Sequence, residues 1–266
     1  GVDVCFGNPG TSEMHFVAAL DSVPEMRGVL TLFEGVATGA ADGYARMSGD
    51  PAAVLLHLGP GLGNGLANLH NARRARVPMM VVVGDHAIYH KKFDAPLESD
   101  IDSVAETVSG WVRRSTGPAD VADDAVAAIA FARSEQRIAT LILPADVSWS
   151  DGAQPAGSVV PQPSPVSIET EDIEAALASG APTVILVGGD ATRAPGLDAA
   201  ARLAHRYGAQ LFCETFPARL ERGAGVPAAE RIAYFGEAAV AQLDRTRHLI
   251  LAGAVSPVTF FGYPGK

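Results

Sequence analysis

The stretch LTLFEGVATGAADGYA, residues 30–45, joins an apolar run to a helix built of small residues. The carboxylate at this junction, Glu34, directly follows Phe33, so we expect it to be buried. Burying a charge is costly unless a partner or a proton removes the cost. Two interpretations follow: a carboxyl that shares a proton with a ligand near neutral pH, or a capped or paired residue at a helix start, where the dipole favours it.

Glycines recur every fourth residue along this helix, at Gly35, Gly39 and Gly43. Each costs about 1 kcal/mol of helix stability relative to Ala. Such a stripe is typical of a helix that another backbone approaches closely. We therefore expect self-association through this face, and we expect that replacing Gly39 by Leu overpacks the contact.

The amino-acid composition and the length limit the classes of protein to which the chain can belong. With 266 residues, 48% of them hydrophobic, the chain is long enough for two domains. A net charge of −10 without a basic run argues against nucleic acid and against an anionic membrane surface. The longest apolar run, residues 77–83, is too short to span a membrane, and the N-terminus has no signal-peptide pattern. Cys5 and Cys213 are interpreted as reduced core thiols of a cytoplasmic protein.

Short apolar runs alternate with helical patterns, which predicts an α/β fold: a doubly wound parallel sheet covered by helices on both faces. Proline, glycine and serine predict an extended linker over residues 151–167. We expect one domain over residues 1–150 and a second, truncated Rossmann-like domain over 168–266. The chain opens on a strand-like run and ends without a closing element, so we expect it to be a piece of a longer protein.

Two turns after predicted strands carry ligand-binding features, since open α/β sheets bind ligands at the carboxyl ends of strands. The turn FGNPGTSE, residues 6–13, combines two glycines with hydroxyls that can cap the next helix. The turn HLGPGLGNG, residues 57–65, has four glycines that let a ligand lie against the backbone. It matches a dinucleotide fingerprint poorly, because Asn64 replaces a small residue and Pro60 lacks an N–H. A planar ring stacked over this glycine-rich turn fits the sequence as well as a dinucleotide does.

Histidines near strand ends have a structural and a chemical interpretation. His57 ends a predicted strand and is either a hydrogen-bonded structural residue or a catalytic one. His86 and His90 follow Asp85 in a predicted loop, and without a zinc signature we interpret them as solvated side chains. The sequence contains neither a nucleophilic-serine elbow nor a Walker phosphate-binding sequence.

The order of the motifs resembles thiamine-diphosphate-dependent enzymes. The matching segments are GNPGT at residues 7–11, EG at 34–35, ADGYAR at 41–46, GPGLGN at 59–64 and VGD at 83–85. The similarity is to the pyrimidine-binding domain of the family that includes acetolactate synthase, pyruvate oxidase and benzoylformate decarboxylase. It covers nearly all of residues 1–150, and residues 168–266 resemble the family's central domain.

The resemblance implies roles for the motif residues. The family's counterpart of Glu34 protonates N1′ of the cofactor's aminopyrimidine, which promotes loss of the thiazolium C2 proton. His57 matches an active-site histidine of benzoylformate decarboxylase that acetolactate synthases generally lack. The residues implied to line the cofactor and the mouth of the site are Asn8, Pro9, Gly10, Thr11, Pro60, Gly61 and Asn64.

Thiamine diphosphate and Mg²⁺ are the implied cofactors. The Mg²⁺ ligands belong to a third domain, whose GDG…NN signature is absent from this sequence, so we expect the chain to be inactive alone. Some relatives carry FAD in the central domain, and residues 187–189 do not decide whether this chain binds it. The implied assembly is a homodimer or homotetramer with the cofactor site between subunits.

The implied substrate is a 2-oxo acid, decarboxylated with or without carboligation. An acetolactate-synthase-like activity is the first interpretation. Pro96 and Leu97 count against a strict version of it, because acetolactate synthases have Phe and Gln there. A benzoylformate-decarboxylase-like lyase is the alternative that His57 favours. A nucleotide-binding Rossmann protein and a non-catalytic module on the same scaffold are further alternatives.

Overall fold

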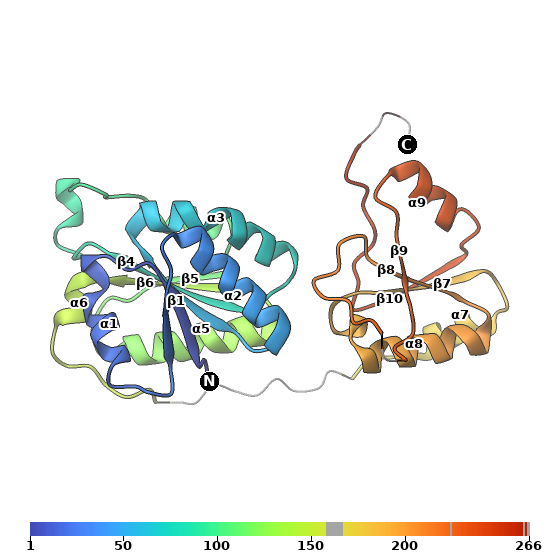
Figure 1. Cartoon of the computed structure of the whole chain (residues 1–266), viewed down its shortest axis with the longest axis horizontal. Helices are drawn as coiled ribbons and strands as arrows, with labels where there is room; N and C mark the ends of the chain where they lie inside the picture. The colour runs from blue at the N-terminus through green and yellow to red at the C-terminus, as the bar shows by residue number, and fades with distance from the viewer. Residues whose placement is uncertain (158–166, 224, 263, 265–266) are drawn as a thin grey trace. The chain divides into compact units, whose positions relative to one another are not determined.

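The computed structural model describes residues 1–157, 167–223, 225–262 and 264. The chain divides into two compact units, Gly1–Ser164 and Pro165–Lys266 (Figure 1). Most of the predicted linker, residues 158–166, lies outside the described residues.

The first unit is built on a six-stranded sheet with the order β2-β1-β3-β4-β6-β5. All of its strand pairs are parallel. The strands are β1 (Val4–Gly7), β2 (Arg27–Leu30), β3 (Ala52–His57), β4 (Met79–Asp85), β5 (Trp111–Arg114) and β6 (Ile138–Pro144). Strands β4 and β6 are buried along their whole length, as expected for central strands covered on both faces.

Helices cover both faces of this sheet (Figure 1). Packed on one face are α2 (Glu34–Ser48), α3 (Leu58–Arg74) and α4 (Ile101–Glu106). Packed on the other are α1 (Met14–Leu20), α5 (Val121–Glu135) and α6 (Ala145–Trp149). Two short 3-10 turns, η1 (Thr11–Glu13) and η2 (Lys91–Phe93), complete the unit. The predicted α/β class with a doubly wound parallel sheet is confirmed.

The glycine-rich segment after β3 is helical, so the prediction of an irregular turn there is wrong. Helix α3 begins at Leu58, whose φ of 50° lies in the left-handed region and turns the chain directly from strand to helix. The glycines serve close packing: a Cβ on Gly65 would lie 2.9 Å from the Thr38 side chain of α2. The ligand-facing residues of this segment therefore project from the first turns of a helix rather than from a loop.

The glycine stripe of α2 has two different surroundings. A Cβ on Gly39 would lie 2.9 Å from Asn68 Nδ2, while one on Gly43 would meet nothing within 4 Å. Asn68 also donates to the Gly35 carbonyl at 2.7 Å. Part of the close approach that the stripe predicts is thus made by α3 of the same chain. A Gly39→Leu change would strain this internal contact and cannot report on self-association.

The second unit has a four-stranded parallel sheet with the order β10-β7-β8-β9. Its elements are α7 (Glu171–Ala178), β7 (Thr183–Val187), η3 (Gly189–Thr192), α8 (Ala194–Tyr207), β8 (Gln210–Cys213), β9 (Glu230–Arg231), α9 (Gly236–Leu243) and β10 (His248–Ala252). Helices α7 and α8 contribute to one apolar cluster and α9 to another. The second unit is therefore also a layered α/β structure.

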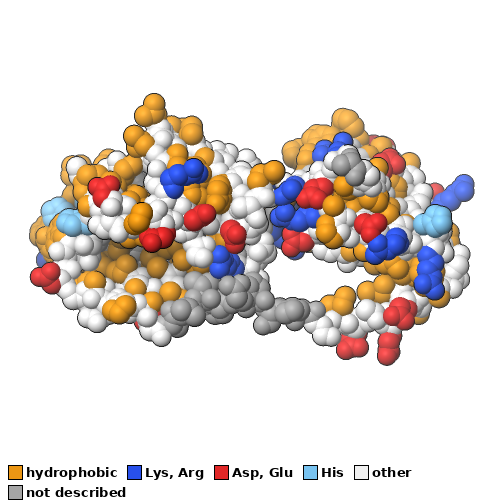
Figure 2. All heavy atoms as spheres, turned by 60° about the horizontal axis from the view of Figure 1, so that its bottom comes forward, with side chains coloured by type: hydrophobic (Ala, Val, Ile, Leu, Met, Phe, Trp, Pro, Cys, Tyr) orange, Lys and Arg blue, Asp and Glu red, His pale blue; other side chains and the backbone are white. Residues whose placement is uncertain are grey.

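The surface mixes charge and apolar groups. On the face shown in Figure 2, acidic, basic and apolar side chains alternate over both units. Within the described residues, no helix combines the length and apolar character that a membrane crossing requires. Cys5 and Cys213 are both buried and unpaired, and burial raises the pKa of the Cys5 thiol to about 12.

Candidate active site

The predicted site residues meet where the connections of the first sheet change direction. From β1 the chain passes to β2 on one side and then to β3 on the other. In open α/β sheets such a switch point leaves a crevice at the carboxyl ends of the strands, where ligands bind. Asn8 follows β1, Glu34 follows the loop after β2, and His57 is the last residue of β3.

Glu34 is buried, as predicted, with 8% of its surface exposed. Its Oε1 accepts a hydrogen bond from Asn8 Nδ2 at 3.1 Å, and its Oε2 accepts one from Asn64 Nδ2 at 3.0 Å. The side chain does not cap its own helix, although Glu34 is the first residue of α2. Two amide groups therefore compensate the burial of this carboxylate and fix its position.

The carboxylate of Glu34 keeps capacity for a further partner. A carboxylate offers about four lone-pair sites, and the two amides occupy one site on each oxygen. Gly61 stands behind the group: a Cβ there would lie 3.6 Å from Glu34 Oε1. The arrangement can exchange a hydrogen-bonded proton with a planar ring nitrogen that enters the crevice.

The remaining predicted residues divide between neighbouring places. Gly10 lies against the imidazole of His57, since a Cβ on Gly10 would come within 2.4 Å of Nδ1. Thr11 lines a separate cavity described below. Pro9 shares the loop of Asn8, and Pro60 is exposed in the first turn of α3. The structure thus brings Asn8 and Asn64 to Glu34, and Gly10 to His57.

Glu13 is a site residue that the sequence did not reveal. Its side chain is buried, and its Oε2 accepts from the Gly10 N–H at 2.7 Å and lies 2.8 Å from His57 Nδ1. Its Oε1 has no hydrogen-bond partner among the described residues. Burial raises the pKa of Glu13, although the Gly10 N–H and the charge of His57 lower it. The only sequence signal was a Glu at the third position of the turn after Gly10, which is typical of a capping box.

The pKa shift of Glu13 predicts how stability depends on pH. Because the folded protein holds this proton more tightly than the unfolded chain, the stabilisation is complete below the ordinary pKa of 4.5 and is lost as pH rises through the raised value. An amide does not titrate, so Glu13→Gln should gain stability relative to wild type as the pH rises above 4.5. Urea unfolding of both proteins across this range measures the difference. A constant or falling difference would contradict the assignment.

A buried aspartate fixes the loop that borders the site. Asp85, the last residue of β4, has no exposed side-chain surface and pairs with Arg114 and with Lys91, whose Nζ lies 3.0 Å away. Lys91 also pairs with Glu98 at 2.5 Å, so both ends of the loop are tied together. Ser99, the next residue, places its hydroxyl where a Cβ on Gly59 would lie. The loop is therefore held against the start of α3.

The loop also carries the histidines interpreted as solvated. His90 is exposed and His86 is half-buried, with ring centroids 5.9 Å apart. Across the described residues, no group of three or more His, Cys, Asp or Glu side chains is placed to hold a metal ion.

Comparison with known proteins identifies the class. Residues 1–105 match the family described as thiamine pyrophosphate enzyme, N-terminal TPP binding domain. Over 265 residues the chain is 71% identical to the Mycobacterium tuberculosis protein named "Putative acetolactate synthase large subunit IlvX", and the match covers 100% of this chain and 52% of that protein. The chain belongs to the thiamine-diphosphate-dependent enzyme family.

A further relative and a solved structure are also similar to this chain. Benzoylformate decarboxylase of Pseudomonas aeruginosa is 32% identical over 157 residues, which are 59% of this chain and 29% of that protein. The fold matches a thiamine diphosphate-dependent 4-hydroxybenzoylformate decarboxylase of Rhodococcus jostii RHA1 with a TM-score of 0.86 at 22% identity, covering 100% of this chain and 51% of the other. The chain thus spans about half the length of its 71% identical relative and of the Rhodococcus protein. Its match to the Pseudomonas protein covers 29% of that protein.

Proposed function

We propose that this chain supplies the pyrimidine-binding half of an enzyme that uses thiamine diphosphate to decarboxylate a 2-oxo acid. The observation that carries the proposal is the Glu34 carboxylate, buried at the switch point of the sheet and held by Asn8 and Asn64. When bound, thiamine diphosphate supplies a nucleophilic carbon and an electron sink for such a decarboxylation.

The residues present fit an aminopyrimidine. Glu34 holds or releases a proton at a ring nitrogen through the acceptor sites that the two amides leave open. Asn8 and Asn64 fix the position of the carboxylate, so little reorganisation accompanies the transfer. Because Gly61 has no side chain, the space beside Glu34 Oε1 stays open. We propose that Mg²⁺ and the diphosphate bind to residues outside this chain.

Two substrate classes remain, and separate observations favour them. An acetolactate-synthase-like reaction, decarboxylation with carboligation, is supported by the 71% identical relative. A benzoylformate-decarboxylase-like lyase is supported by the pair of His57 and Glu13, which can hold one proton between them beside the crevice. Neither Pro96 nor Leu97 supplies the side chain that acetolactate synthases carry there.

An assay of the protein purified from its natural source distinguishes these two substrate classes. Carbon dioxide release with added thiamine diphosphate and Mg²⁺ is measured for pyruvate and for benzoylformate, with products identified. We expect release that depends on thiamine diphosphate. Acetolactate from pyruvate supports the first class, and benzaldehyde from benzoylformate supports the second. No cofactor-dependent release from any 2-oxo acid would refute the proposal and favour a non-catalytic module.

We further propose that a second copy of the chain covers the apolar surface around Glu34. The exposed fractions there are 92% for Leu32, 48% for Phe33 and 55% for Val36. Contiguous exposed apolar surface marks interaction sites in soluble proteins. Buried, unpaired thiols at Cys5 and Cys213 accord with a cytoplasmic protein.

A charge placed in this surface should weaken self-association. Val36→Asp puts a carboxylate into the buried centre of the proposed contact and should weaken it at least about tenfold. Val240→Asp is the matched control, because Val240 is 61% exposed on a helix of the other unit. Sedimentation velocity over a concentration series measures both variants. A monomeric wild type, or equal effects of the two changes, would contradict the proposal.

A further inference from the structure

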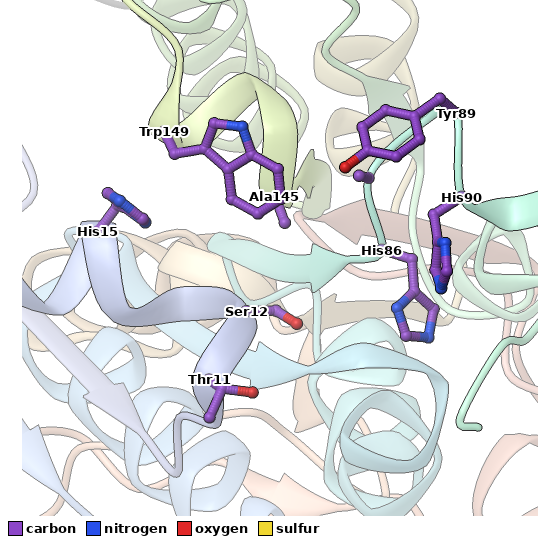
Figure 3. Close-up of a pocket in the computed structure, with 9 residues that line it drawn as sticks. Thr11, Ser12, His15, His86, Tyr89, His90, Ala145 and Trp149 are labelled. Carbon is purple, nitrogen blue, oxygen red and sulfur yellow. The ribbon is translucent and has the colours of Figure 1, made fainter. Parts of the chain in front are cut away.

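A cavity of about 320 Å³ opens beside the carboxyl edge of the first sheet (Figure 3). Three segments line it: the turn and helix after β1, the loop after β4, and α6. Thr11 borders it, whereas Glu34 and its partners Asn8 and Asn64 are not part of its lining. Glu34 and the residues that hold it therefore contribute nothing to the walls of this cavity.

Aromatic rings form two opposing walls of this cavity. Figure 3 shows His15 and Trp149 on one side of Ser12, and Tyr89 and His90 on the other. The rings meet edge to face, with centroids 6.5 Å apart for His15 and Trp149 and 6.4 Å apart for Tyr89 and His90. Trp149 and Tyr89 are 50% and 63% exposed, so ring surface remains for a ligand. Aromatic walls of this kind favour a planar ring.

The polar groups of the cavity suit an anion. Hydroxyls of Thr11 and Ser12 and three imidazoles line it, and its lining contains no Asp or Glu, in a chain of net charge −10. His86 Nε2 lies 3.0 Å from the Pro96 carbonyl, which can only accept, so this nitrogen carries its proton and fixes the ring. Hydroxyl and imidazole N–H groups form strong hydrogen bonds with a carboxylate.

We propose that this cavity binds a small planar carboxylate, an aryl or heteroaryl acid, at a site separate from the Glu34 crevice. A volume of about 320 Å³ accommodates one ring and one short acidic group. The aromatic walls hold the ring, while Ser12 and the imidazole N–H groups of His15 and His90 receive the carboxylate. The site requires no thiamine diphosphate, so it stands independently of the function proposed above.

Fluorescence of Trp149 provides a direct test, because the chain has only two tryptophans and the other, Trp111, does not line the cavity. Benzoate, its neutral analogue benzamide and the non-planar cyclohexanecarboxylate are titrated into the chain without cofactor. We expect a saturable change with benzoate and at least about tenfold weaker binding of both analogues. Benzamide binding as tightly as benzoate, or no saturation by benzoate at about 10 mM, would overturn the proposal.

Variants locate the ligand. His15→Gln and Ser12→Ala should each weaken benzoate binding about threefold to tenfold. His70→Gln, on the exposed side of α3, is the control and should leave binding unchanged. Asn64→Ala, which removes a partner of Glu34 and does not line the cavity, should also leave it unchanged; a loss with this variant would place benzoate beside Glu34 and refute a separate site. An equal loss with the His70 control would refute it as well.

Discussion

Replacing Glu34 by Gln in the naturally expressed protein should lower kcat for 2-oxo acid decarboxylation by about 10²–10⁴-fold, the usual range for a general acid–base group. The amide keeps the size of the side chain but cannot exchange the proton that the carboxyl exchanges. It also presents an NH₂ group to one of the two donors, Asn8 or Asn64, so one of these amides must rotate. This rearrangement should cost only about 1 kcal/mol of folding stability.

Asp42→Asn is the matched control for this variant. It makes the same carboxyl-to-amide change two turns further along α2, where Asp42 pairs with Arg46 at 2.8 Å. A partly exposed pair four residues apart on a helix contributes about 0.5 kcal/mol, so a small loss of stability and an unchanged kcat are expected. Steady-state kinetics and urea unfolding measure both variants. A Glu34→Gln enzyme within tenfold of wild type would remove Glu34 from catalysis.

Replacing Asp85 by Ala should lower the free energy of unfolding by on the order of 3–5 kcal/mol. The change leaves Arg114 and Lys91 with one carboxylate partner each, Asp102 and Glu98, and leaves the His86 N–H, now 2.7 Å from Asp85 Oδ1, without its acceptor. The loop from His86 to Ser99 should then become sensitive to limited proteolysis.

Asp50→Ala provides the comparison for Asp85. Asp50 pairs with Arg133 at 3.3 Å, but its side chain is 65% exposed, so its loss should cost less than about 1 kcal/mol. Urea unfolding of the two variants gives the difference. Equal losses would mean that the buried network does not stabilise the first unit.

The sequence predicted most regular elements because their patterns are local. Examples are the strands Trp111–Arg114 and Thr183–Val187 and the helix Val121–Glu135. Each is a continuous apolar or periodic run between breakers. Short elements such as Ala145–Trp149 and Glu230–Arg231 were missed, because a run of five residues or fewer carries little periodicity.

Part of the site depends on contacts between distant residues, which local sequence patterns do not predict. Glu34, Asn8 and Asn64 were all predicted, because each lies in a motif of the family. The partnership of Glu13 with His57 joins residues 44 positions apart and exists only because β1 and β3 are neighbours in the sheet. The helical start at Leu58 was missed because glycine and proline are weak helix formers, and only packing against α2 compensates for them.

Hydrogen–deuterium exchange at C2 of added thiamine diphosphate tests the central claim most directly, since this exchange precedes any choice of substrate. The naturally expressed protein is compared with its Glu34→Gln and Asp42→Asn variants, with melting measured on the same samples. We predict exchange about 10²–10⁴-fold slower in Glu34→Gln, normal exchange in Asp42→Asn, and intact folding in both. A Glu34→Gln protein that is less stable but exchanges C2 at the wild-type rate would contradict the account and make Glu34 a structural residue.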